Sequence, residues 1–84
     1  MSRLIPAAER LRRARLMIQQ ARNLPVPAEG KYDFSYIARV KALLQDARDL
    51  VKFIPKSPSA TPERKEQVRQ VFEEADRADR EILH

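Results

Sequence analysis

Few residues of this sequence have side chains that could perform catalysis. The only histidine, His84, is the last residue, and the sequence has no cysteine. A general base or a metal ligand needs neighbouring groups that hold it in place, which a terminal residue lacks. Ser57 and Thr61 therefore have no histidine in reach to activate them as nucleophiles. A single glycine, Gly30, cannot form a glycine-rich phosphate loop. We therefore expect no enzymatic activity, no cofactor and no small-molecule substrate.

Carboxylates near the end of the sequence are the best candidates for a metal site. Glu73, Asp76 and Asp79 are three residues apart, so they share one side of a helix. Arg69 and Arg80 each lie four residues from one of them, at the spacing of helical ion pairs. Metal sites in helix bundles combine carboxylates with inward-pointing histidines from several helices. The pattern therefore favours an exposed, ion-paired face, and we expect no metal ion.

Arginines are concentrated in one segment, and guanidinium groups can bind phosphates as charged forks. The candidate phosphate-binding residues are Arg10, Arg12, Arg13 and Arg15. They are distributed around a helix rather than along one edge, so a solvated or internally paired face is the alternative interpretation. The sequence has neither a helix-turn-helix spacing nor an exposed aromatic set for stacking bases. Nucleic-acid binding by this segment is therefore the second functional hypothesis.

An outward-facing line of residues on the same helix has the composition of a protein contact. Leu16 lies almost opposite the apolar stripe of its helix, framed by arginine and glutamine. Apolar residues mixed with arginine are typical of protein interfaces, although single surface leucines are also common. The candidate partner-binding residues are Ile5, Arg12, Arg13, Leu16 and Gln20. The first functional hypothesis is thus a non-enzymatic module that binds another protein or a second copy of itself across a two-fold axis.

Helices must position these residues, because composition and periodicity both indicate an all-α protein. The chain is 43% hydrophobic and 35% charged, and it is rich in the side chains that lose least conformational freedom in a helix. Apolar residues recur at steps of three and four in three segments. We predict helices at about 3–24, 33–54 and 61–83, with Leu4 in the first apolar stripe and Pro6 in the first turn.

The second segment carries two adjacent apolar stripes, so it must contact two neighbours. Leu44 and Val51 belong to one stripe and Leu43 to the other. Asp33 and Thr61 are predicted N-caps of the second and third helices. Phe53 lies off both stripes and is expected to pack beneath the polar turn that follows.

The whole chain of 84 residues has the length of one domain, residues 1–84. Short connections between helices of similar length require antiparallel neighbours, so the fold class is an antiparallel three-helix bundle. The net charge of +5 comes mainly from the first helix, and opposite-charge pairing with the third helix is expected. The sequence contains no apolar run that fits a signal peptide or a membrane span, so we expect a cytoplasmic protein without membrane association.

Overall fold

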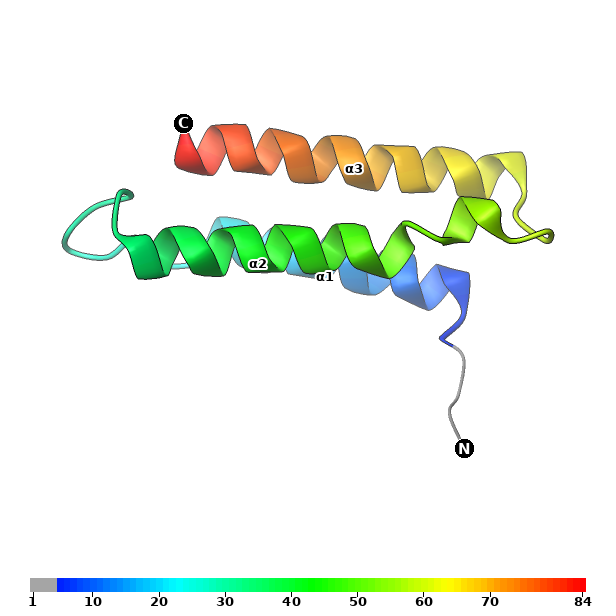
Figure 1. Ribbon diagram of the computed structural model, residues 1–84, viewed down its shortest axis with the longest axis horizontal. Helices are drawn as coiled ribbons and strands as arrows, with labels where there is room; N and C mark the ends of the chain where they lie inside the picture. The colour runs from blue at the N-terminus through cyan, green and yellow to red at the C-terminus, as the bar shows by residue number, and fades with distance from the viewer. Residues whose placement is uncertain (1–4) are drawn as a thin grey trace.

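The computed structural model describes residues 5–84, which form three α-helices packed against one another (Figure 1). The helices are α1 (Ala7–Asn23), α2 (Phe34–Val51) and α3 (Pro62–Leu83), and a short 3₁₀ helix, η1 (Ile54–Lys56), follows α2. Successive helices run in opposite directions, and each contacts the other two. The predicted fold class, an all-α antiparallel three-helix bundle, is confirmed.

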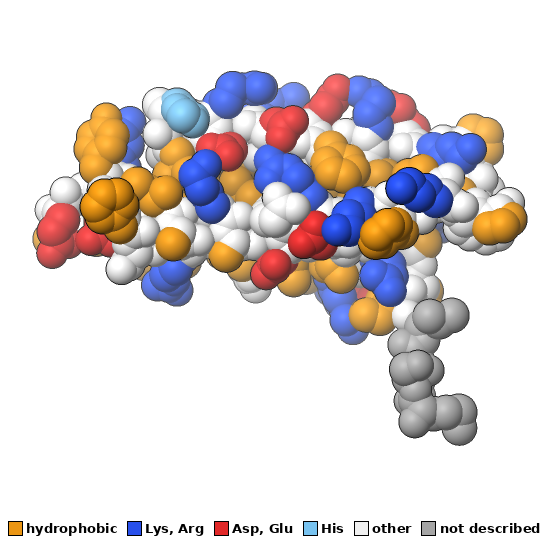
Figure 2. Space-filling model, in the orientation of Figure 1, with side chains coloured by type: hydrophobic (Ala, Val, Ile, Leu, Met, Phe, Trp, Pro, Cys, Tyr) orange, Lys and Arg blue, Asp and Glu red, His pale blue; other side chains and the backbone are white. Residues whose placement is uncertain are grey.

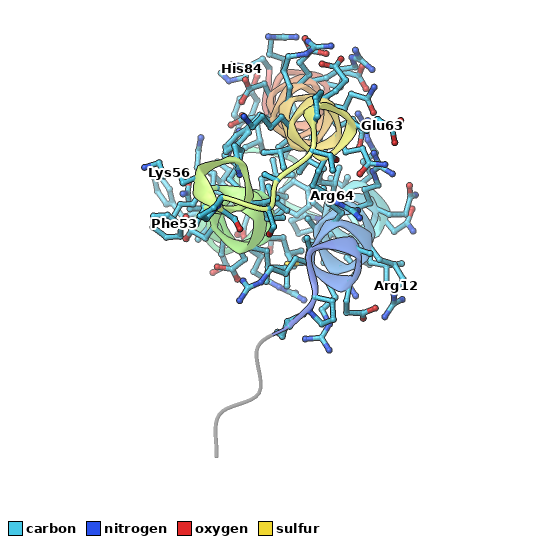
Figure 3. The ribbon with its side chains drawn as sticks, turned by 90° about the vertical axis from the view of Figure 1, so that its right-hand side faces the viewer. Arg12, Phe53, Lys56, Glu63, Arg64 and His84 are labelled. Carbon is cyan, nitrogen blue, oxygen red and sulfur yellow. The ribbon has the colours of Figure 1, made fainter. Side chains whose placement is uncertain are left out.

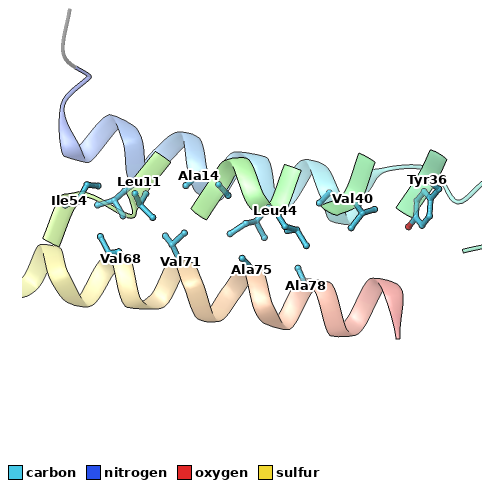
Figure 4. Close-up of a cluster of buried hydrophobic side chains, with 14 residues drawn as sticks. Leu11, Ala14, Tyr36, Val40, Leu44, Ile54, Val68, Val71, Ala75 and Ala78 are labelled. Atoms are coloured by element: carbon cyan, nitrogen blue, oxygen red, sulfur yellow. The ribbon is translucent and has the colours of Figure 1, made fainter. Parts of the chain in front are cut away.

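Fourteen buried apolar side chains fill the space between the helices (Figure 4). Leu44 and Val51 of α2 are fully enclosed, and Leu43 packs against the same cluster from the second stripe. Alanines on the facing sides, such as Ala14 and Ala75, keep the helices close, since they add little volume. The two-stripe pattern of α2 thus predicted correctly that this helix contacts both neighbours.

Both predicted N-caps are present. The Asp33 carboxylate accepts a hydrogen bond from the backbone N–H of Tyr36 at 2.9 Å. The Thr61 hydroxyl accepts one from the N–H of Arg64 at 3.1 Å. Each cap satisfies a backbone donor that has no partner inside its own helix.

The helix α1 begins later than the sequence pattern predicted. Its first residue is Ala7, and Pro6 flanks the helix with extended backbone angles instead of lying in the first turn. The ring of a proline disfavours helical angles at the residue before it, here Ile5, so the helix cannot continue backward through this position. Arg3 and Leu4, which the prediction included, lie outside the described residues.

The helix α2 ends at Val51, three residues earlier than predicted. Pro55 has no N–H to donate to the Val51 carbonyl, so the α-helical pattern stops and the chain tightens into η1. The expectation that Phe53 packs beneath the following turn is wrong, because its side chain is 63% exposed.

Ion pairs join α3 to both of the other helices. Arg22 of α1 contacts Glu81 at 2.6 Å, as the expected pairing between the first and third helices requires. Asp76 lies 2.7 Å from Arg48 of α2, and Asp79 lies 3.6 Å from Lys41 of α2. These two aspartates pair with α2 and not, as predicted, with arginines of their own helix. Basic and acidic side chains are accordingly interspersed over the face that Figure 2 shows.

Candidate functional site

Two of the predicted phosphate-binding arginines are bound to a carboxylate of their own helix. Arg12 donates through Nε to Glu9 at 2.9 Å, and Arg13 donates through Nε to the same carboxylate at 3.1 Å. These hydrogen bonds lower the pKa of Glu9 from 4.5 to about 2. Glu9 therefore stays ionised at neutral pH and offsets part of the positive charge of this segment.

Arg10 is held by two backbone carbonyl groups. Its Nε donates to the carbonyl of Ile5 at 3.2 Å, and its Nη1 donates to the carbonyl of Leu50 at 3.3 Å. The Leu50 carbonyl lies in the last turn of α2, where carbonyls lack helical partners. Arg10 thus connects the start of α1 to the end of α2. These two hydrogen bonds assign Arg10 a structural role.

Leu16 lies beside a groove of about 430 Å³ between α1 and α3. It is 47% exposed, the largest exposed apolar side chain on α1. Leu11 and Ala8 continue the apolar lining, and basic and amide groups border it. The residues that line this α1–α3 groove are Ala8, Leu11, Arg12, Arg15, Leu16, Arg64 and Gln67. Arg12 and Leu16, two of the predicted partner-binding residues, therefore belong to one surface.

The α1–α3 groove carries positive charge that neighbouring groups do not neutralise. Arg15 donates to the side-chain oxygen of Gln70 at 3.4 Å, and Arg64 donates to that of Gln67 at 3.2 Å. Both acceptors are neutral amides. Within residues 5–84, no carboxylate lines the groove. The site therefore combines an exposed leucine with two guanidinium groups that lack an acidic partner.

The other predicted partner-binding residues lie elsewhere. Ile5 precedes α1, is half-buried and lines a separate cleft at the end of the bundle. Arg13 and Gln20 are exposed on α1, but neither lines the α1–α3 groove. The five predicted partner-binding residues, from Ile5 to Gln20, therefore do not form one continuous surface.

The sequence interpretation missed Arg64, although the pattern of α3 contained a signal for it. Val68, Val71, Ala75 and Ala78 form the buried stripe of this helix. Arg64 lies four residues before Val68, so it continues that stripe by one turn toward the end of the bundle. An arginine at such a position can lay its aliphatic part against the core and direct its guanidinium outward.

An exposed group of apolar residues at the opposite end of the bundle was also missed. Val26 and Tyr32 of the α1–α2 connection are 61% and 74% exposed, and Phe34 at the start of α2 is 88% exposed. Phe34 lies on neither apolar stripe of α2, which is the signal that the sequence offered. The charges near this surface favour neither an acidic nor a basic partner, because Lys31 is positive and Glu29 and Asp33 are negative.

Residues 5–84 contain no group of three or more histidines, aspartates and glutamates that could hold a metal ion. None of the helices described here is both long enough and apolar enough to cross a membrane. Comparison of the chain with known protein families, curated proteins and solved structures found no match.

Proposed function

We propose that this protein is a non-enzymatic interaction module that binds another protein through the α1–α3 groove. One observation carries the proposal: a half-exposed leucine, Leu16, lies in a groove bordered by two arginines, Arg15 and Arg64, that have no acidic partner. Protein interfaces combine an apolar centre with a polar rim. Arginine is enriched among the residues that dominate their binding energy.

The chemistry of the groove favours an acidic amphipathic helix as the partner segment. Such a helix places apolar side chains at steps of three and four along one face, as in other helix-in-groove complexes. These side chains would contact Leu16 and Leu11. Carboxylates beside them would replace the amide acceptors of Arg15 and Arg64, because hydrogen bonds between two charged groups are stronger than those to an amide.

Nucleic acid is the less favoured partner, because three of the four predicted phosphate ligands already have carboxylate or carbonyl contacts. Arg12 and Arg13 share Glu9, and Arg10 holds two backbone carbonyls. A phosphate would have to displace these contacts. A second copy of the chain is also disfavoured, since pairing two α1–α3 grooves would bring like charges together.

Two designed peptides test the proposal. One is an amphipathic helix with leucines on one face and glutamates beside them, and the other has lysine in place of each glutamate. We expect the protein to raise the fluorescence anisotropy of the labelled glutamate peptide only. Leu16→Glu should remove the binding by placing a charge in the groove. Phe34→Glu, at an exposed aromatic residue far from the groove, is the matched control and should bind like the wild type.

Three outcomes would contradict the proposal. Equal binding of both peptides would indicate non-specific adhesion, and an unchanged affinity for Leu16→Glu would place binding elsewhere. A duplex or single-stranded DNA probe that binds at low salt, and is lost in the double variant Arg12→Glu and Arg13→Glu, would support the nucleic-acid hypothesis instead.

A further inference from the structure

A second hollow, here called the end cleft, opens where α1 begins, where η1 follows α2 and where α3 begins. Figure 3 views the bundle from this end. Its volume is about 660 Å³, within the range of roughly 300–1,000 Å³ that is usual for small-molecule sites. Much of its wall is apolar. The apolar lining residues are Ile5, Ala7, Leu50, Phe53, Ile54 and Ala60.

The polar side of the end cleft is basic. Arg10 and Arg64 both line it, and among the described residues no carboxylate does. In Figure 3, Arg64 lies between the ribbons of α1 and α3. The two carbonyls fix the position of Arg10, but a guanidinium has five N–H donors, so others remain for a ligand. Arg64 is bound only to an amide through its side chain.

Phe53 connects this apolar wall to further positive charge. Its ring is 63% exposed, and the Nζ atoms of Lys52 and Lys56 lie 5.1 and 5.4 Å from the ring centre. Asp49 pairs with Lys52 at 3.2 Å, whereas Lys56 has no carboxylate partner within residues 5–84. The rim of the cleft is therefore both apolar and cationic.

From this arrangement we propose that the end cleft binds an amphiphilic anion, namely a long-chain carboxylate. The carboxylate accepts hydrogen bonds from Arg10 and Arg64, and the alkyl chain lies against Ile54, Leu50 and the ring of Phe53. Both halves of the ligand are needed, because a short anion would lack the apolar contact and a neutral chain would leave the two guanidiniums without a counter-charge. The site is independent of the protein-binding groove except for Arg64, which lines both.

Isothermal titration with decanoate, below its micelle concentration, tests the site. We expect one molecule to bind per chain, with an affinity that rises up to about fourfold for each methylene added from octanoate to dodecanoate. Acetate and decanol should bind at least tenfold more weakly than decanoate. No saturable binding of decanoate up to millimolar concentrations, or equal binding of decanol, would overturn the proposal.

Substitutions in the lining of the end cleft test where decanoate binds. Arg64→Gln should weaken decanoate binding about tenfold or more, as expected for losing a hydrogen bond between charged groups. Phe53→Ala should weaken it several-fold, and this exposed residue can change without disturbing the core. The matched controls Arg77→Gln and Phe34→Ala lie away from the cleft and should leave the affinity unchanged. Equal weakening by the controls would overturn the site.

Leu16→Glu separates this inference from the proposed function. Leu16 lines the α1–α3 groove but not the end cleft, so decanoate binding should persist in the variant that no longer binds the glutamate peptide. Loss of decanoate binding in Leu16→Glu, with circular dichroism unchanged, would place the ligand in the groove and overturn the end-cleft assignment.

Discussion

Leu44 is completely enclosed by the three helices, whereas Leu16 is half-exposed on the groove. Leu44→Ala removes several buried methyl and methylene groups and leaves a cavity, so it should lower the free energy of unfolding by roughly 2–5 kcal/mol. Leu16→Ala is the matched control and should have a much smaller effect. Urea denaturation followed by circular dichroism measures both. Similar midpoints for Leu44→Ala and the wild type would show that this stripe is not the core.

Glu9 should make the stability of the protein depend on pH. Its pKa is about 2 in the folded state, against an ordinary value of 4.5, because Arg12 and Arg13 donate hydrogen bonds to the carboxylate. The lowered pKa means that the ionised form stabilises the fold. This stabilisation is complete above about pH 4.5 and is lost as the pH falls to about 2. Solvent screens the contacts of Glu9 with these two exposed arginines, so the change in stability with pH should be small.

Glu9→Gln tests this dependence by thermal unfolding. The variant should melt below the wild type at neutral pH. The two melting temperatures should converge as the pH falls from about 4.5 to about 2. Glu29→Gln, in the connection between α1 and α2, is the matched control. A difference in melting temperature that stays constant from neutral pH down to pH 2 would contradict the assignment.

Each N-cap should contribute measurably to the helix that it begins. Thr61→Ala and Asp33→Ala each remove the side-chain acceptor for a backbone N–H at the start of α3 or α2. Either change should cost about 0.5–2 kcal/mol of unfolding free energy. Ser35→Ala, at an exposed site in the first turn of α2, is the matched control. Equal stability of Asp33→Ala and Ser35→Ala would contradict the capping role.

The helices could be predicted from the sequence better than their limits could. Spacing and N-cap residues gave the existence and order of α1, α2 and α3, since an apolar stripe needs a core to face. The predicted start of α1 and the predicted end of α2 were wrong, and both lie next to a proline. The prediction placed Pro6 inside a first turn, but the restraint that it imposes on Ile5 was decisive. It also ended α2 at Ile54, but the missing N–H of Pro55 ends it at Val51.

The candidate site depends on how helices are paired in space, which the sequence pattern leaves open. Sequence reasoning found Leu16 and Arg12 because both lie on one helix. It did not find Arg64 and Gln67, because the α1–α3 groove exists only once α3 is aligned beside α1. Arg10 illustrates the opposite error. Its residue type indicated phosphate binding, but the end of α2 lies close enough for its carbonyl to accept the hydrogen bond.

The charge of the assembled bundle predicts that the protein alone is a monomer. The chain carries a net charge of +5, and two grooves facing each other would bring Arg15 and Arg64 against their own copies. This repulsion opposes pairing at low salt. At 1 M salt the screening length falls to about 3 Å, so the repulsion is largely removed. The remaining apolar contact is small, because Leu16 is the only large exposed apolar side chain of α1 among the residues described.

Sedimentation equilibrium of the wild type and Leu16→Glu at low and high salt measures this directly. We expect both proteins to be monomeric up to about 1 mM, which means any self-association is weaker than roughly 4 kcal/mol. A wild-type dimer that forms at high salt and is absent in Leu16→Glu would show that the groove pairs with itself once its charge is screened. A second copy of the chain, and not a foreign acidic helix, would then be the partner. A dimer that persists in Leu16→Glu would instead place self-association on another surface, with the exposed ring of Phe34 as the first residue to test.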